Sequence, residues 1–153
     1  MNNTNISIFL IIDGNYTKLN IEKIFIGRNM EYNLDIIKLK AYINGVEYIS
    51  SREFEIMEFA VIDFQKALPK NIQIAGCQAC RHGNFCPYGD NENEIYCLKD
   101  YQPKNKMDVA DIINNDKIFA LPKHELLYCC EEYQKIDETY YNYNDWDYYF
   151  KKQ

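Results

Sequence analysis

Six cysteines are the residues of this sequence whose type and spacing point most directly to chemistry. Cys77 and Cys80 form a C-x2-C pair, five residues separate Cys80 from Cys86, and ten more precede Cys97. Thiolates at C-x2-C spacing can point at one cation from a tight turn, while backbone amides nearby donate hydrogen bonds to the sulfurs. Zinc takes four such ligands in a tetrahedral site. The segment therefore predicts one structural metal site, with zinc as the expected ion.

Two sets of four ligands fit this pattern, because Cys129 and Cys130 follow much later in the chain. The local set consists of Cys77, Cys80, Cys86 and Cys97. The long-range set replaces Cys86 by one of the later pair, Cys130, and would tie a distant segment to the cysteine loop. Sequence spacing alone favours the local set.

Three other interpretations of the cysteines compete with zinc. An iron–sulfur cluster is one, although the spacing matches neither the bacterial nor the plant-type ferredoxin pattern. A cluster of reduced thiols without metal is the second. The third is a dithiol redox pair at Cys77 and Cys80, which lacks the usual βαβ surroundings. His82 lies in the same loop and could replace one cysteine ligand, whereas His124 is expected to be an ordinary, partly exposed residue in the first turn of a helix.

Four short motifs follow one another around the cysteines. They are Cys77-Gln78-Ala79-Cys80, Phe85-Cys86-Pro87-Tyr88-Gly89, Tyr96-Cys97 and Cys130-Glu131-Glu132-Tyr133. In this order they resemble an uncharacterised bacterial family whose members often carry serine at the position of Cys86. The resemblance covers residues 77–133. It implies Cys77, Cys80, Cys97 and Cys130 as metal ligands with Cys86 as a spare, and it implies no activity.

A closed four-sulfur site leaves no open coordination position, so the metal is expected to be structural and not catalytic. Such a site with zinc has a net negative charge, which Arg81, His82 and Lys99 are placed to screen or to satisfy with hydrogen bonds. The chain also contains no phosphate-binding glycine loop, no H-E-x-x-H and no G-x-S-x-G. We therefore expect a non-enzymatic protein. The alternative is a thiol-dependent redox protein or enzyme that uses a free cysteine, Cys86 or Cys129.

Antiparallel strands are expected to precede the cysteine loop. An apolar stretch at 6–13 and an extended pattern at 16–26 flank a turn at Asp13-Gly14-Asn15. Apolar and polar residues alternate at 35–43, with Ile37, Leu39, Ala41 and Ile43 on one face. Asn44-Gly45 and a return strand at 46–49 complete a second hairpin. A short strand is also expected at 72–75. The fold class is thus α+β, with an antiparallel sheet of N-terminal hairpins packed by a helix.

The strongest helix pattern follows these hairpins. Ser50 and Glu53 have the spacing of a capping box, and Pro69 ends the pattern. The apolar residues at helical spacing, which we expect to pack on the sheet, are Phe54, Met57, Val61, Phe64 and Leu68. A second helix is expected at about 122–135 with Pro122 in its first turn, and a short one around 108–113.

Length and composition indicate one domain of 153 residues, with sheet and helix at 1–72 and a cysteine-rich metal-binding part and tail at 73–153. The formal charge of −6 disfavours binding to nucleic acid. No apolar run is long enough to span a membrane, and the N-terminal residues lack the basic start of a signal peptide. We expect a cytoplasmic protein, in which the thiols stay reduced.

The tail at 137–149 combines acidic and aromatic residues. Its partner-binding candidates are Tyr143, Asp145, Trp146 and Asp147, because aromatic side chains are frequent at interface hot spots and acids speed the encounter with a basic partner. Alternatively, these rings complete the core. The sequence favours an acidic, non-enzymatic protein-binding domain with a structural zinc site, such as an immunity-type or regulatory protein that neutralises a basic toxin or nuclease.

Overall fold

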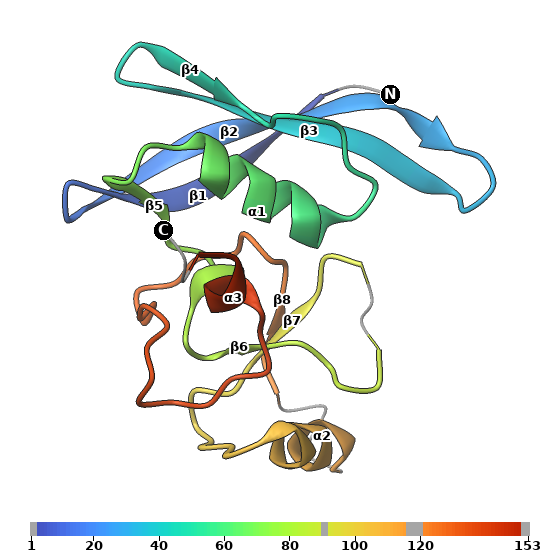
Figure 1. Ribbon diagram of the computed structural model, residues 1–153, viewed down its shortest axis with the longest axis vertical. Helices are drawn as coiled ribbons and strands as arrows, with labels where there is room; N and C mark the ends of the chain where they lie inside the picture. Colours follow the sequence, from blue (N-terminus) through green and yellow to red (C-terminus); the bar gives the residue numbers. More distant parts are fainter. Residues whose placement is uncertain (1–2, 90–91, 116–120, 151–153) are drawn as a thin grey trace. The chain divides into compact units, whose positions relative to one another are not determined.

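A computed structural model describes residues 3–89, 92–115 and 121–150. The chain divides into two compact units, Met1–Ile74 and Ala75–Gln153. The first unit is an antiparallel sheet with one helix (Figure 1), and the second holds all six cysteines. This arrangement confirms the expected α+β class. Within the described residues, no helix has the length and apolar character needed to cross a membrane.

Five antiparallel strands form the sheet of the first unit in the order β4-β3-β2-β1-β5. They are β1 (Thr4–Ile12), β2 (Asn15–Asn29), β3 (Leu34–Ile43), β4 (Val46–Ile49) and β5 (Ile72–Ile74). The alternation in β3 is confirmed, because Ile37, Leu39, Ala41 and Ile43 are all buried. The strands follow each other as a meander except β5, which returns to pair with β1.

Two tight turns fix the register of the first and third hairpins. Asp13 and Gly14 have φ values of 49° and 82°, and Asn44 and Gly45 have φ values of 51° and 79°. Two central residues with positive φ are typical of type I′ turns, which match the right-handed twist of the strands. Both turns lie where the sequence placed them.

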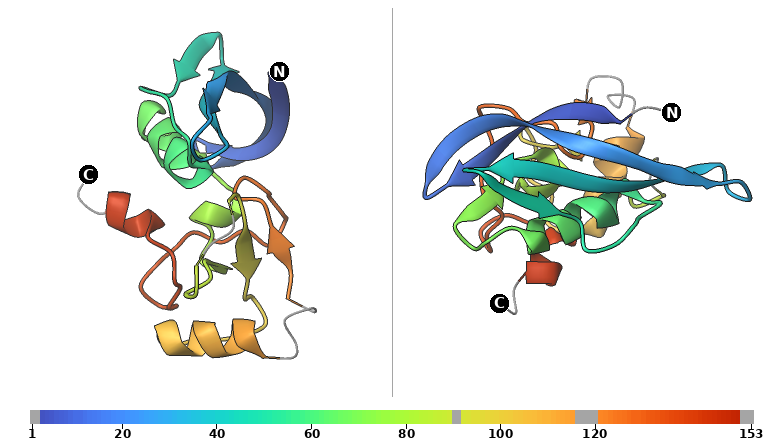
Figure 2. Two further views of the ribbon diagram at one scale, coloured as in Figure 1. Left: turned by 90° about the vertical axis from the view of Figure 1, so that its right-hand side faces the viewer. Right: turned by 90° about the horizontal axis from the view of Figure 1, so that it is seen from above.

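The sheet is curled as well as twisted (Figure 2). The register between β2 and β3 shifts between Phe25 and Gly27, as at a β-bulge, which bends a strand and increases its local twist. The concave side can then wrap helix α1 (Met57–Ala67). The core between them contains the apolar residues expected for the helix, since Phe54, Met57, Val61, Phe64 and Leu68 are all buried.

The expected capping box at Ser50 and Glu53 is wrong. Helix α1 starts at Met57, and its N-cap Ile56 makes no side-chain capping bond. The Ser50 hydroxyl instead accepts a hydrogen bond from the backbone N–H of Leu39 (2.9 Å), and Phe54 pairs with Ile37 as an isolated β-bridge. Residues 50–54 therefore continue the edge of the sheet, and pairing with β3 outweighs the local helix signal.

Gln65 joins the helix to the last strand. It is buried, and its side chain donates to the carbonyl of Ile72 (2.9 Å) and accepts from the backbone N–H of Ile74 (2.7 Å). A buried amide with both ends satisfied fixes the position of an edge strand that has only three residues.

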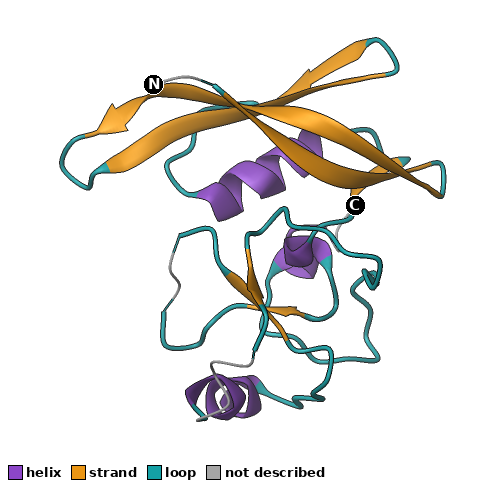
Figure 3. Ribbon diagram, turned by 180° about the vertical axis from the view of Figure 1, so that it is seen from behind, coloured by secondary structure: helices purple, strands orange, loops and turns teal. Residues whose placement is uncertain are grey.

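The second unit is built largely from loops around short elements (Figure 3). Three short antiparallel strands form a sheet in the order β6-β7-β8. The elements are η1 (Cys77–Ala79), β6 (Gly83–Asn84), β7 (Ile95–Cys97), α2 (Lys106–Asn114), β8 (Lys123–His124) and α3 (Trp146–Phe150). A small apolar core of this unit joins α2 to the cysteine loop through the buried residues Leu98, Val109, Ile113 and Leu121.

The short helix expected around 108–113 is confirmed as α2, whose N-cap Asn105 accepts from the backbone N–H of Asp108. The helix expected at 122–135 is wrong, because this segment contains β8 followed by turns. The carbonyls of Leu126 and Tyr128 accept hydrogen bonds from Gln78 and Cys77. These tertiary bonds replace the internal bonds of a helix.

Replacement of Gln65 by leucine should lower the free energy of unfolding by about 2 to 4 kcal/mol, because two buried backbone groups lose their partners. Urea denaturation followed by circular dichroism measures the change. Gln73→Leu is the matched control, since the Gln73 side chain is exposed and, within the described residues, donates its hydrogen bond to the carbonyl of Lys70. Equal losses for both variants would contradict a special role for the buried amide.

Candidate metal centre

The C-x2-C pair lies on a tight turn at the start of the second unit. The N–H of Ala79 donates to the carbonyl of Gly76 (3.0 Å), and that of Cys80 donates to Cys77 (3.2 Å). The chain then folds back, so that a Cβ added to Gly83 would lie 2.1 Å from the carbonyl oxygen of Cys77. Only glycine fits at this approach. The turn keeps Cys77 and Cys80 close together, and both line the same small cavity.

Backbone hydrogen bonds bring the Cys130 segment beside this turn. Cys77 donates to the carbonyl of Tyr128 (2.8 Å), and Arg81 donates to that of Gln134 (2.9 Å). Cys80 also pairs with Lys135 as an isolated antiparallel bridge. Residues 128–135 therefore run along the C-x2-C turn on both sides of Cys130.

The small sheet brings Cys97 to the same place. Gly83 of β6 pairs with Cys97 of β7, and Ile95 of β7 pairs with His124 of β8. Residues far apart in the sequence thus meet beside the C-x2-C turn because three short strands align them.

Four cysteines line one small cavity of about 20 Å³, which is room for a single water molecule or ion. They are Cys77, Cys80, Cys97 and Cys130. The other ionisable residues on its lining are His82, Tyr96, Lys99, His124 and Glu132. All six cysteines are in the reduced thiol form. In the described part of the chain, no group of three or more His, Cys, Asp or Glu side chains is gathered tightly enough to hold a metal ion, so a bound ion would have to draw these sulfurs closer together.

Backbone amides already point at two of the sulfurs. The N–H groups of Gln134 and His82 donate to Cys80, and that of Lys99 donates to Cys97, and these bonds favour the thiolates. Burial acts in the opposite direction and outweighs them, so the pKa of Cys80 and of Cys97 is raised. His82 and Lys99 each donate to the cysteine sulfur two residues earlier, and such bonds would orient these sulfurs as ligands if a metal were bound.

Cys77 shows most clearly what a cation would change. Burial raises the pKa of its thiol, and the neighbouring cysteines, first Cys80 and then Cys130 and Cys97, raise it further. Negative charges cannot gather in this cavity without a counter-charge. A divalent cation reverses the balance, because a coordinated thiol is deprotonated. Four sulfurs are the ligand type that zinc takes in structural sites, but the described sulfurs would have to move closer together to hold the ion.

The cations near the cavity are fixed by partners. Lys99 forms an ion pair with Glu132, which raises the pKa of Lys99 and lowers the pKa of Glu132. Burial is the largest cause that lowers the pKa of His82 and of His124. The next cause is the positive charge of Arg81 for His82 and the positive charge of Lys99 for His124. The ring of His124 stacks on Tyr128, with centroids 4.1 Å apart. His124 belongs to β8 and the cavity wall, so its expected place in a helix is wrong.

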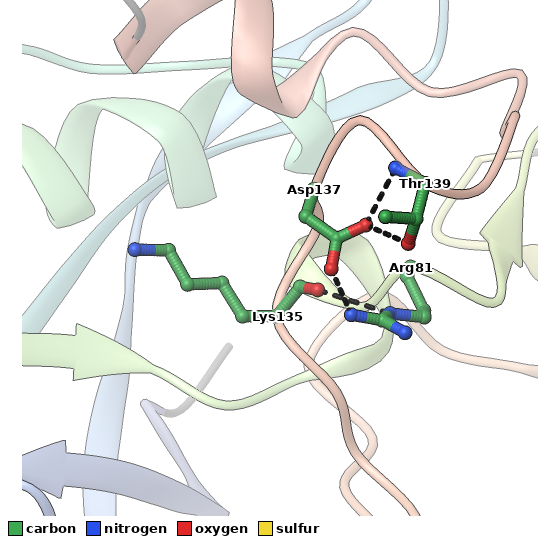
Figure 4. Close-up of polar contacts among 4 residues, drawn as sticks. All are labelled: Arg81, Lys135, Asp137 and Thr139. Carbon is green, nitrogen blue, oxygen red and sulfur yellow. Dashed lines mark hydrogen bonds and ion pairs between the residues drawn. The ribbon is translucent and has the colours of Figure 1, made fainter.

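Arg81 fastens the following segment to the turn, as Figure 4 shows. Its side chain donates to the carbonyl of Lys135 (3.2 Å) and forms an ion pair with Asp137. The guanidinium also lies over the ring of Tyr140, 4.7 Å from its centroid. Asp137 accepts from the backbone and hydroxyl of Thr139, and these bonds, ahead of the charge of Arg81, lower the pKa of Asp137. The residue directly after Cys80 thus anchors the start of the tail.

The remaining cysteines lie in other surroundings. Cys86 is half-buried and packs against the apolar core of Leu98, Val109, Ile113 and Leu121, and it is not part of the cavity lining. Cys129 is half-buried. Its effect on the pKa of Cys77 is smaller than the effects of Cys80, Cys130 and Cys97.

The four partner-binding candidates of the tail differ in how far their side chains are exposed. Trp146 is only 7% exposed and packs against Phe150, while Tyr143 packs on the α2 core under the ammonium group of Lys106. Asp145 is half-buried, and its Oδ1 has no hydrogen-bond partner among the described residues. Asp147 alone of the four lies on an open groove, whose lining is completed by Asp137, Glu138, Tyr140, Tyr141, Asn142, Asn144 and Tyr148.

Sequence reasoning missed several residues of both regions. His124 and Glu132 line the cavity, and only the pairing of β8 with β7 places His124 there. Glu138 and the exposed tyrosines of the groove carried a signal, since they belong to the same acidic and aromatic stretch as the candidates. Which aromatic rings of the tail are buried depends on tertiary hydrogen bonds, and these bonds cannot be predicted from the sequence.

Replacement of Arg81 by methionine should loosen residues 134–140, because a hydrogen bond, an ion pair and a ring contact are lost together. Hydrogen exchange of the backbone amides there should become roughly five- to tenfold faster. Lys135→Met removes the same charge from a side chain that points away from this cluster (Figure 4), and should leave exchange unchanged. A similar acceleration in both variants would mean that charge alone is responsible.

No protein-family model matches the chain, and no curated protein or solved structure matches it either.

Proposed function

We propose that this protein is a non-enzymatic protein-binding domain held together by a structural zinc ion, and that it acts as an immunity-type or regulatory protein on a basic partner. The observation that carries the proposal is the cavity lined by Cys77, Cys80, Cys97 and Cys130. Three distant parts of the chain supply these thiols. Two of the thiols, those of Cys80 and Cys97, accept hydrogen bonds from backbone amides.

The role of the metal follows from the number of its ligands. Four thiolates fill a tetrahedral shell and leave no position for a substrate or a water molecule. The ion would then act by joining the C-x2-C turn, β7 and the segment after Tyr128. The second unit has few regular elements of its own, which makes such a link valuable for its stability.

The basic partner is suggested by the distribution of charge. Residues 75–153 contain nine Lys and Arg against fourteen Asp and Glu, a balance of −5, whereas residues 1–74 contain eight against nine, a balance of −1. The acidic excess therefore belongs to the cysteine-containing unit. A one-sided charge favours encounter with an oppositely charged protein.

A thiol-dependent redox protein or enzyme receives less support. Cys86 is half-buried and packs against the apolar core of Leu98, Val109, Ile113 and Leu121, which limits access to its sulfur. A titration of accessible thiols on native, metal-loaded protein separates the two functions, since a fast-reacting Cys86 or Cys129 would favour the enzyme.

Native protein should contain about one zinc ion per chain, measured by elemental analysis. Cys130→Ser should lose the metal because it removes one wall of the cavity, and Cys86→Ser should keep it. Treatment with a chelator should lower the melting temperature of the wild type and of Cys86→Ser.

The two serine variants form a matched pair, since each removes one half-buried thiol. Loss of zinc in Cys86→Ser with retention in Cys130→Ser would support the local ligand set. A wild-type protein without metal, with a melting curve that a chelator does not move, would contradict the site altogether. An iron–sulfur cluster would reveal itself by iron in the same measurement.

A purified complex should show the basic partner directly. Affinity capture at low salt should enrich a protein of high isoelectric point that re-forms a stoichiometric complex when both components are pure, and salt should weaken the complex because screening reduces charge attraction. A reconstituted partner with an acidic surface, or a complex that is indifferent to salt, would contradict the proposed electrostatic recognition.

A further inference from the structure

The tail of the second unit carries an open groove of about 440 Å³, lined by side chains of residues 137–148. This volume falls within the range of about 300 to 1,000 Å³ that is typical of small-molecule sites. The described residues on its lining are tyrosines, asparagines and acids, with no aliphatic and no basic side chain among them. The groove thus offers flat rings and planar polar groups to a ligand.

Three tyrosine rings of the groove are open to solvent. Tyr148 is 76% exposed, and Tyr140 and Tyr141 are exposed as well. The guanidinium of Arg81 lies over the ring of Tyr140, and His82 makes an edge contact with the same ring. A ring that is fixed before binding loses little conformational entropy in the complex. Tyrosine rings pack on flat arrays of C–H groups, and their hydroxyls both donate and accept hydrogen bonds.

The cysteine loop also fixes the backbone of the groove in advance. Asn84 accepts a hydrogen bond from the N–H of Tyr143 (2.7 Å). Asn144, which lines the groove, donates to the carbonyls of Gln78 (2.8 Å) and Gly83 (3.2 Å). The two residues that directly follow position 142 are therefore held in place before any ligand arrives.

Asn142 brings to the groove a hydrogen-bond donor that the described chain does not use. It belongs to the lining, and its Nδ2 is buried without a hydrogen-bond partner among the described residues. A buried donor in this condition costs free energy, and such groups in native proteins are generally met by water or by a ligand. A ligand oxygen brought into the groove would accept this hydrogen bond.

The charges of the groove restrict the class of ligand. Carboxylates on the lining, such as the exposed Glu138, disfavour a ligand that carries phosphate, sulfate or carboxylate groups. Asp137, in contrast, forms an ion pair with Arg81 and accepts from Thr139, so it has little to add for a cationic ligand. We therefore expect a neutral and strongly polar ligand.

A sugar ring combines the features that this lining accepts. One face of a pyranose presents C–H groups, which pack on an aromatic ring. Its hydroxyls each donate and accept, so they can donate to carboxylates and accept from amides. We propose that the groove formed by residues 137–148 binds a neutral oligosaccharide, with a sugar ring on an exposed tyrosine and a sugar oxygen accepting from Asn142. This binding is separate from the recognition of a basic protein, and either can be absent without the other.

Saturation-transfer difference NMR on the full chain tests the site. Lactose, maltotriose and chitotriose are the neutral probes, and sialyllactose is the anionic counterpart of lactose. We expect saturation transfer to at least one neutral probe, strongest at the C–H protons of one ring face, because those protons lie on the tyrosine. Sialyllactose should bind more weakly than lactose, because the carboxylates of the groove repel its charge.

Two groove variants should lose affinity for the neutral probe that binds. Tyr148→Ala should raise its Kd about three- to tenfold, since an exposed ring is removed. Tyr88→Ala is the matched control, because Tyr88 is 68% exposed and lies outside the groove, and it should bind as the wild type does. Asn142→Ala should weaken binding by a similar factor while the melting temperature stays unchanged, since the amide nitrogen has no partner in the described chain.

Several results would overturn the proposal. They are a lack of transfer to all three neutral probes, an equal loss of affinity in Tyr148→Ala and Tyr88→Ala, and tighter binding of sialyllactose than of lactose. A Tyr148→Ala variant that keeps the sugar but loses the basic protein would assign the groove to that partner instead. The melting temperature of each variant separates lost binding from lost folding, and the tyrosine pair decides the question alone if Asn142→Ala is destabilised.

Discussion

The second unit is assembled on one short segment, residues 76–85. Its backbone exchanges hydrogen bonds with Leu126, Tyr128, Gln134 and Tyr143, and its carbonyls of Gln78 and Gly83 hold Asn144. A segment that serves so many partners has little freedom of its own. Gly83 shows how tight the constraint is, because any larger residue would meet the carbonyl of Cys77. The thiol cavity and the tail groove both depend on this one geometry.

The two units solve the problem of stability in different ways. The first buries a continuous apolar face between a curled sheet and α1, so the hydrophobic effect supplies its main driving force. The second distributes its apolar residues between a small core at α2 and single buried side chains such as Ile95, Leu126 and Trp146. A unit with so many loops has little apolar core of its own, which is why the proposed metal link would add to its stability.

Those parts of the fold that the sequence predicted are the ones governed by local rules. Asp13-Gly14 and Asn44-Gly45 specify their turns because few residue pairs accept two positive φ angles, and the apolar period of α1 specifies its buried face. Turn chemistry and periodicity act over a few residues, so one sequence suffices to read them.

The errors occur where a tertiary bond replaces a local one. Ser50 has the spacing of a helix cap but serves the sheet, and the apolar positions near Leu126 and Cys130 imitate a helix while their backbone joins the cysteine loop. The spacing of the cysteines predicted only part of the set that lines the cavity. Spacing alone favoured Cys86, whereas the cavity includes Cys130, and this choice depends on backbone hydrogen bonds from Cys77 to Tyr128 and from Arg81 to Gln134, more than 50 positions along the chain. Similarly, nothing in the aromatic stretch distinguishes the buried Trp146 from the exposed Tyr148.

The order of the strands has a consequence for how the chain acquires its structure during synthesis. Each hairpin of the first unit joins neighbouring stretches, and β5 closes the sheet against β1, so this unit can be complete once the ribosome has released Ile74. Residues 76–85 emerge next, but their hydrogen-bonding partners extend to Asn144. Until that point the cysteine loop lacks part of its hydrogen bonding, and its thiols are more accessible to oxidants than in the folded chain. The nascent second unit is therefore the half of the molecule that is exposed for longer.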